Sequence, residues 1–312
     1  MPYHALDPGA YVVVVGNMNA DICAKSSAPL ELHDSNPGTV RISPGGVGRN
    51  IAHNLCLLGA NVHMLSAVGA DTFANYLEET CIECGMDVSH VLHVKHGVTP
   101  TYAFIADPDG EMAVAVCDAE LSEQISPEYL ADHAQLLRQA AAVVVETNLS
   151  ENALRYLAET CQGPLFADTV SVAKCSRLLP IMGRIHTLKP NLLEAEKLSG
   201  ISIRDQGSLE AAAAAILKMG VKRVFISLGA DGVFYADHAQ CRREPCFQTH
   251  LVNATGGGDA MMAAITFAFL CGMSAEETVR FALAASAICV ESEATISGNM
   301  KFDRVIQRMR TT

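Results

Sequence analysis

Basic residues are scarce in this sequence. The 312 residues include 22 Lys and Arg against 34 Asp and Glu, which gives a formal net charge of −12. Non-specific binding to nucleic acid depends on basic patches that meet phosphate groups. The charge balance therefore argues against a nucleic-acid partner. It does not exclude a small anionic substrate, because a cluster of backbone N–H groups can bind an anion inside an acidic protein.

A long apolar segment is also lacking. The longest apolar run, around Ala260–Met273, is too short to span a bilayer and is typical of a buried helix. The beginning of the chain, MPYHALDPGAYVVVV, shows no basic region followed by an apolar one, as a secretory signal peptide would. The sequence therefore predicts a cytoplasmic protein without a membrane partner.

The cysteines form no recognisable framework. Eleven are scattered along the chain, and only Cys81 and Cys84 stand in a C-x-x-C pattern, inside a stretch that is predicted to be helical. No second pair follows at the spacing of a zinc finger. We interpret these two residues as ordinary thiols rather than metal ligands.

What is present is an alternation of strand and helix patterns. Half of the residues are hydrophobic and 18% are charged, as in a globular chain with a substantial core. The predicted strands are Tyr11–Val15, Val62–Ser66, Ala142–Glu146, Leu165–Asp168, Thr187–Leu188 and Arg223–Ser227. The predicted helices are Val47–Leu58, Thr72–Cys84, Glu151–Thr160, Leu193–Ser199, Leu209–Met219 and two that begin at Asp259 and Ala275. Apolar strands that alternate with amphipathic helices predict an α/β fold with a largely parallel sheet.

Two segments interrupt this alternation. Gly38–Ser43 and Thr101–Cys117 have the pattern of antiparallel strands, and the second is predicted to be a hairpin around Asp107–Gly110. Strands inserted at such places would form a small flap over one end of the parallel sheet. Ligands bind at that end in open α/β sheets, so the flap is predicted to act as a lid.

Two glycine-rich stretches precede helices, SPGGVGRNIAHN and NATGGGDAMMA. Neither contains the G-x-x-x-x-G-K-[ST] sequence of a P-loop or the G-x-G-x-x-G sequence of a dinucleotide-binding turn. This excludes the usual nucleotide motifs and argues against an NAD-dependent enzyme. Each stretch alone is compatible with a simple tight turn.

The second stretch has a chemical interpretation. Gly256, Gly257 and Gly258 leave successive backbone N–H groups unobstructed at the positive end of a long helix, which suits a phosphate or another anion. Asp259 follows directly. A carboxylate there is either a favourable charge at a helix start or a base that accepts a proton from a hydroxyl attacking that phosphate. The second alternative is the chemistry of a small-molecule kinase.

Three further stretches fit the same interpretation. HTLKPNLLEAE places Lys189, Asn191 and Glu194 at a strand-to-helix junction, where they suit phosphate and Mg²⁺ or form a solvated helix start. SLGADGV, at Ser227–Val233, is either the edge of a nucleotide site or a plain hairpin. Asp21 follows the first strand, where it is a turn residue or an acceptor for sugar hydroxyl groups.

Taken together, these motifs resemble the ribokinase-like (PfkB) carbohydrate kinase family. The resemblance extends over essentially the whole chain and rests on N-x-D at Asn19–Asp21, GGVGRN at Gly45–Asn50, N-x-x-E at Asn191–Glu194, SLGADG at Ser227–Gly232 and TGGGD at Thr255–Asp259. It implies a single domain over residues 1–312, built as a three-layer sandwich around a mostly parallel sheet. It also implies a β-strand lid formed by about 22–43 and 99–117, and a homodimer through that lid.

The resemblance also implies roles for individual residues. Asp259 matches the catalytic base, and Gly256, Gly257 and Gly258 match the anion hole. The residues that match the substrate site are Asp21, Gly45, Gly46, Asn50 and Asn148. The residues that match the ATP site are Lys189, Asn191, Ser227, Gly229 and Gly232. Glu194 matches the residue that positions Mg²⁺ through water.

Within the family, DSNPGTVRISPGGVGRNIAHNL and FADTVSVAKC are most similar to members that use ATP to phosphorylate the 5′-hydroxyl of pseudouridine. The alternatives are another ribonucleoside, a free sugar such as ribose, or a non-catalytic sugar-binding protein. Two positions depart from the family pattern. Gly257 stands where the family more often has alanine, and Asn253 stands where many members have an aspartate that shapes a monovalent-cation site, which argues against potassium activation.

Overall fold

The structure, a computed structural model, describes residues 6–310 and contains an eight-stranded sheet. Its strand order is β14-β13-β12-β11-β10-β9-β1-β4, parallel from β4 to β12 and antiparallel beyond. The bounds are β1 Val12–Val15, β4 Val62–Leu65, β9 Ala142–Glu146, β10 Leu165–Asp168, β11 Ile185–Lys189, β12 Arg223–Ser227, β13 Val233–Asp237 and β14 Cys241–Glu244. The predicted α/β fold with a mostly parallel sheet is confirmed.

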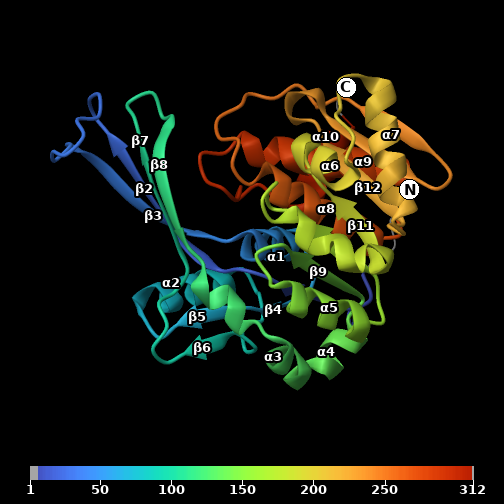
Figure 1. Cartoon of the computed structure of the whole chain (residues 1–312), viewed down its shortest axis with the longest axis horizontal. Coiled ribbons are helices and arrows are strands. Elements are labelled where there is room, and N and C mark those ends of the chain that lie inside the picture. The colour runs from blue at the N-terminus through green and yellow to red at the C-terminus, as the bar shows by residue number, and fades with distance from the viewer. Residues whose placement is uncertain (1–5, 311–312) are drawn as a thin grey trace.

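Helices cover both faces of this sheet (Figure 1). In β1, Val12 and Val14 belong to one core and Val13 and Val15 to the other, because successive side chains of a strand point to opposite faces. The first core is covered by α1 Val47–Leu58, α2 Thr72–Glu83, α8 Gly257–Leu270, α9 Ala275–Val290 and α10 Phe302–Met309. The second is covered by α3 Pro127–Asp132, α4 Ala134–Gln139, α5 Glu151–Thr160, α6 Leu192–Ser199 and α7 Gln206–Lys218.

A separate four-stranded sheet projects from the body next to α2 (Figure 1). Its order is β3-β2-β7-β8, with β2 Asn19–Ser26, β3 Gly38–Gly45, β7 Thr101–Ala106 and β8 Met112–Asp118. The two segments that were predicted to form the lid lie in this one sheet, and we call it the lid sheet. They do not pair with each other directly, because β2 lies between β3 and β7. Asp21 belongs to β2, so its interpretation as a turn residue is wrong.

Short elements complete the described residues 6–310. A two-stranded sheet joins β5 Ala67–Gly69 to β6 Leu92–Val94, and three 3₁₀ segments are η1 Glu120–Gln124, η2 Cys175–Arg184 and η3 Gly229–Asp231. Helix α1 has the predicted bounds, since Gly46 and Gly59 flank it with positive φ angles that other residues rarely adopt. Within residues 6–310, no helix has both the length and the apolar character needed to cross a membrane.

Candidate active site

Three charged side chains meet at the carboxyl end of the main sheet. Glu146, Asp168 and Lys189 are the last residues of β9, β10 and β11, and the strand register places them side by side. All three are at most 5% exposed. Lys189 Nζ lies 3.0 Å from Asp168 Oδ2. A charged cluster of this kind is costly to bury, so its presence at the ligand-binding edge indicates a functional site.

Lys189 remains charged in this environment. Burial is the largest single influence and lowers the pKa of its ammonium group, but the charge and hydrogen bond of Asp168, together with the charges of Asp259 and Glu194, outweigh it. The pKa of Lys189 is therefore raised above the usual value for a lysine. The site thus keeps a fixed positive charge among acidic groups, as the binding of a phosphate requires.

Asp259 lies in the first turn of α8, next to this cluster. Gly256 caps the helix in the left-handed conformation, with a φ of 86°, and the helix begins at Gly257. The Asp259 carboxylate is half-buried, and its Oδ2 accepts a hydrogen bond of 2.9 Å from Asn50 Nδ2 in α1. Two motifs more than two hundred residues apart in the sequence therefore meet in one site.

The pKa of Asp259 is raised to about 7. Burial is the largest cause, and the negative charge of Asp168 adds to it, while the hydrogen bond from Asn50 and the charge of Lys189 act in the opposite direction. A general base works best when its pKa is close to the ambient pH. This carboxylate can therefore accept a proton at neutral pH and release it again.

The glycines before Asp259 differ in the atoms that a Cβ atom would meet at each position. A Cβ atom on Gly256 would lie 2.2 Å from the carbonyl oxygen of Thr295, so no larger residue fits without a backbone shift. A Cβ atom on Gly258 would lie 3.3 Å from Lys189 Nζ, so this glycine faces the lysine. The first N–H groups of α8 have no partner within the helix. No hydrogen bond within residues 6–310 occupies these N–H groups, so they can bind an anion beside the ammonium group of Lys189.

Asp21 faces the glycines at the end of β3. Its Oδ1 accepts a hydrogen bond from Asn19 Nδ2, and burial raises its pKa to about 6, against the opposing effects of Asn19 and Arg49. A Cβ atom on Gly45 would lie 2.3 Å from Asp21 Oδ2, and one on Gly46 would lie 2.3 Å from a backbone oxygen. The two glycines therefore let the strands approach closely around a half-buried carboxylate.

Asn191 and Glu194 form a capping box at the start of α6. Asn191 Oδ1 accepts from the Glu194 N–H at 2.9 Å, and Glu194 Oε2 accepts from the Asn191 N–H at 2.8 Å. Thr169 and the Asn191 amide also donate to the Glu194 carboxylate, which is only 4% exposed. The alternative of a solvated helix start is therefore wrong for Lys189 and Glu194, whereas Asn191 is exposed. The carboxylate is so fully engaged that it fits a metal-bound water better than direct coordination of Mg²⁺.

The predicted ATP-site residues of the SLGADG motif lie at the end of β12. The backbone N–H of Ser227 donates to Pro190 at 2.9 Å, and Ser227 pairs with Asn191 in an isolated bridge, so the two predicted ATP segments adjoin. Gly229 and Gly232 have φ angles of 61° and 95° in the turn between β12 and β13. Within residues 6–310, no hydrogen bond joins either glycine to the charged cluster.

Asn148 has a partner that the sequence analysis missed. Its Oδ1 accepts a hydrogen bond from Lys174 Nζ, and its own N–H donates to the buried carboxylate of Glu146. Arg177 donates to three backbone oxygens in the turn after β9 and holds this turn in place. Glu146, Asp168 and Lys174 were all missed. A signal for the first two existed, since both end predicted parallel strands and such ends share one edge of a sheet.

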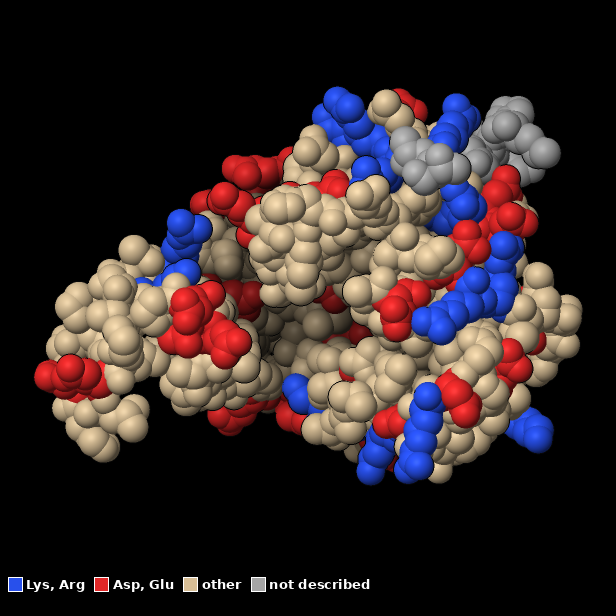
Figure 2. All heavy atoms as spheres, turned by 90° about the horizontal axis from the view of Figure 1, so that it is seen from above, with Lys and Arg blue, Asp and Glu red and all other residues tan. Residues whose placement is uncertain are grey.

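The surface is hollowed between the lid sheet and the body, and acidic side chains lie at the edge of the hollow (Figure 2).

Asn253, which stands where many family members have an aspartate at a monovalent-cation site, lies three residues before Gly256. Its Oδ1 accepts from the N–H of Thr255, and its Nδ2 donates to Glu293. The side chain thus secures the loop before α8 by neutral hydrogen bonds.

Comparisons with known proteins agree with this geometry. The pfkB family carbohydrate kinase profile matches residues 10–301. A pseudouridine kinase of Escherichia coli (strain K12) is 39% identical over 95% of each chain, and an uncharacterised sugar kinase of the same strain is 36% identical over 89% of this chain and 77% of that one. The structure of an Arabidopsis thaliana ribokinase complexed with ribose and ATP superimposes with a TM-score of 0.88 at 23% identity, over 97% of this chain and 99% of the other.

Proposed function

The chain belongs to the pfkB family of carbohydrate kinases, which transfer a phosphoryl group to an alcohol, and we propose that it phosphorylates the 5′-hydroxyl of pseudouridine with ATP. The observation that carries the proposal is the half-buried Asp259 beside the free N–H groups of α8, with a pKa raised to about 7. Similarity to a pseudouridine kinase over 95% of both chains supports the choice of substrate.

In the proposed reaction, Asp259 accepts the proton of the attacking hydroxyl group. The hydroxyl oxygen forms a bond to the γ-phosphorus of ATP, the bond from that phosphorus to the ADP oxygen breaks, and the proton moves to the carboxylate. Asn50 orients this carboxylate by its hydrogen bond to Oδ2, which leaves Oδ1 available to the substrate. Because phosphoryl transfer is largely dissociative, the base acts late in the step.

Charge on the transferring group is stabilised by the chain itself. The N–H groups at the start of α8 and the ammonium group of Lys189 lie where that charge develops, and such fixed donors give the largest catalytic contribution. Glu194 would hold Mg²⁺ through water, and the ion would neutralise charge on the phosphates of ATP. The lid sheet would exclude water, which suppresses hydrolysis of ATP.

On the substrate side, Asp21 would accept hydrogen bonds from the sugar hydroxyl groups, as its raised pKa and the close glycines at the end of β3 suit an uncharged polar ligand. Lys174 is held by Asn148, whose N–H donates to the buried carboxylate of Glu146 in the charged cluster. Its ammonium group suits a carbonyl oxygen of the base, a contact that a free sugar cannot make. We therefore assign Lys174 to the recognition of the base.

Substrate preference gives the first test. Pseudouridine should show a higher kcat/KM than uridine, ribose or fructose 6-phosphate when ADP release is measured with Mg²⁺ and ATP. Lys174→Met should lower kcat/KM for pseudouridine by about 10- to 100-fold, as expected for a lost hydrogen bond to a charged donor, and should change the value for ribose much less.

The matched control is Lys218→Met, which removes an exposed lysine at the end of α7 and should leave both values unchanged. A clear preference for ribose or a hexose phosphate would reject pseudouridine as the substrate while the kinase reaction stands. Equal losses for pseudouridine and ribose in Lys174→Met would reject the assignment of this residue to the base.

We also propose that the lid sheet pairs with the lid sheet of a second copy. Successive residues of a strand point to opposite faces of a sheet, and the strand register shows which side chains share a face. One face of the lid sheet carries large apolar side chains that are exposed. Val40 is 68% exposed and Val116 is 69% exposed. The other large apolar side chains on this face are Ile42, Ile105 and Val114. An apolar patch of this kind marks an interaction surface.

This dimer gives the second test. Sedimentation should show a mass of two chains for the natural protein and of one chain for the double variant Val40→Lys and Val116→Lys, because burying two charges in the interface is costly. Val98→Lys is the matched control, as Val98 is 62% exposed but lies outside the lid sheet, and it should remain dimeric. A natural protein of one-chain mass would reject the proposal.

A further inference from the structure

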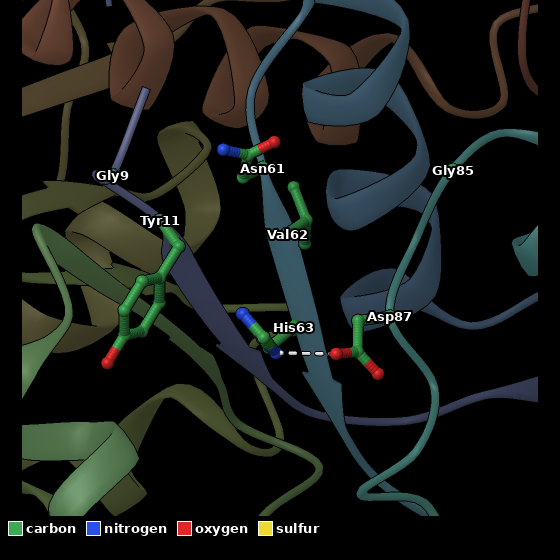
Figure 3. Close-up of a pocket in the computed structure, with 7 residues that line it drawn as sticks. All are labelled: Gly9, Tyr11, Asn61, Val62, His63, Gly85 and Asp87. Atoms are coloured by element: carbon green, nitrogen blue, oxygen red, sulfur yellow. Dashed lines mark ion pairs between the residues drawn. The ribbon is translucent and has the colours of Figure 1, made fainter. Parts of the chain in front are cut away.

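A second group of possible ligands lies far from the charged cluster, at the amino ends of β1 and β4. His63 is the second residue of β4, and Asp87 and His90 follow α2. One ligand atom from each of these three side chains lies within 4.8 Å of the other two. Figure 3 shows His63 and Asp87 facing each other beside Tyr11, at a cavity of about 320 Å³.

Two of these atoms lie close enough for an ion pair but are not aligned for a hydrogen bond. His63 Nδ1 is 3.0 Å from Asp87 Oδ2, yet this buried nitrogen has no hydrogen-bond partner within residues 6–310. Two ligands of one metal ion have this arrangement, because each points at the ion rather than at the other ligand.

The backbone around the group is already ordered. Strand β4 is the edge of the main sheet, and the N–H and C=O of Asp87 bond to it at 2.9 Å each, opposite His63. The Ser89 N–H donates to Asp87 Oδ1 at 2.8 Å, which turns Oδ2 towards His63. Tyr129 donates to the carbonyl of His90. Such outer contacts are what hold ligands in position around a metal.

From this geometry we propose a zinc-type divalent cation site formed by His63, Asp87 and His90, with water in the fourth position. Two imidazoles and one carboxylate are a ligand set that zinc accepts in tetrahedral geometry. The ion would tie the segment after α2 to the edge strand of the main sheet. That segment continues through β6 to β7, so the ion would stabilise the base of the lid sheet.

Cobalt titration of the metal-free, tag-free chain tests the site. Co²⁺ bound by imidazole and carboxylate gives weak visible bands, whereas thiolate ligands add an intense near-ultraviolet band. The spectrum therefore distinguishes cobalt at the proposed site from cobalt bound by any of the eleven free cysteines. The visible bands should form in the natural chain and in His96→Ala, which removes an exposed histidine of the same segment. They should be absent from His90→Ala.

Thermal unfolding with Zn²⁺ gives an independent result. Zn²⁺ at a hundred times its Kd should raise the melting temperature by roughly 5 °C in the natural chain and in His96→Ala. It should not raise the melting temperature of His90→Ala or His63→Gln. Retained kinase turnover shows that these variants are folded. Equal cobalt binding by His90→Ala, a spectrum dominated by thiolate, or no spectrum at millimolar cobalt would each overturn the proposal.

Discussion

Asp259→Asn should lower kcat by about 10²- to 10⁴-fold, the range expected when a general base is lost. Asparagine keeps the size of the side chain and can still accept the hydrogen bond from Asn50, so the start of α8 should be preserved. Binding of the nucleoside should weaken far less than turnover, because the base acts in the transition state. Steady-state ADP release and equilibrium binding measure the two effects separately.

The control is another aspartate in the first turn of a helix. Asp303 is exposed near the start of α10, and Asp303→Asn should have nearly normal kcat. If Asp259→Asn also keeps nearly normal turnover, then Asp259 is only a favourable charge at a helix start, and the base must be sought elsewhere in the cluster.

The raised pKa of Asp259 adds a prediction about pH for the same variant. The natural enzyme should lose kcat/KM below about pH 7, as the carboxylate becomes protonated, and this acid limb should be absent from the residual activity of Asp259→Asn. The raised pKa of Asp259 also predicts how the stability of the folded chain changes with pH. Because the folded pKa lies above the usual value of 3.8 for an aspartic acid, the folded state binds more protons between the two values, and the free energy of unfolding falls as pH rises through this window. Asp259→Asn should therefore be more stable than the natural chain above pH 7.

Much of the main sheet could be predicted because its strands are continuous apolar runs between clear turn signals. The four valines of β1 are fully buried, as their composition indicates, and α1 ends where Gly59 allows a left-handed cap. The lid sheet was harder to predict. Strand β2 has mixed polarity and intermediate burial along most of its length, so no alternation of apolar and polar residues marks it.

The candidate site was predicted where one short motif contains the chemistry, as in TGGGD. It was missed where the chemistry arises between motifs. Asp168 is an ordinary residue in its own sequence context, and its importance depends on the register that places it opposite Lys189. The hydrogen bond from Asn50 to Asp259 likewise joins two helices through the packing of α1 against α8. Such relations depend on three-dimensional pairing, which local patterns do not contain.

The second large effect should come from Gly256→Ala, with an expected loss in kcat of about 10²- to 10³-fold, as for a displaced group of an anion hole. Gly256 has a φ of 86°, where an alanine is strained, and its Cβ would meet the carbonyl oxygen of Thr295 at 2.2 Å. The turn must shift to relieve both conflicts, and the N–H groups at the start of α8 shift with it. The melting temperature should also fall.

Gly257→Ala, one residue later, is the matched control and should change kcat by no more than a few fold. Gly257 does not have a positive φ, and its Cβ would lie 2.9 Å from Val290 Cγ1 and 3.2 Å from Ser286 Oγ, two side-chain atoms that can move slightly. Alanine also favours a helix by about 1 kcal/mol over glycine, which offsets the contact. The N–H group remains in place, since only a hydrogen atom on Cα is replaced. Turnover measured on both variants distinguishes the two causes: equal losses would mean that bulk near the helix start matters rather than the left-handed turn at Gly256.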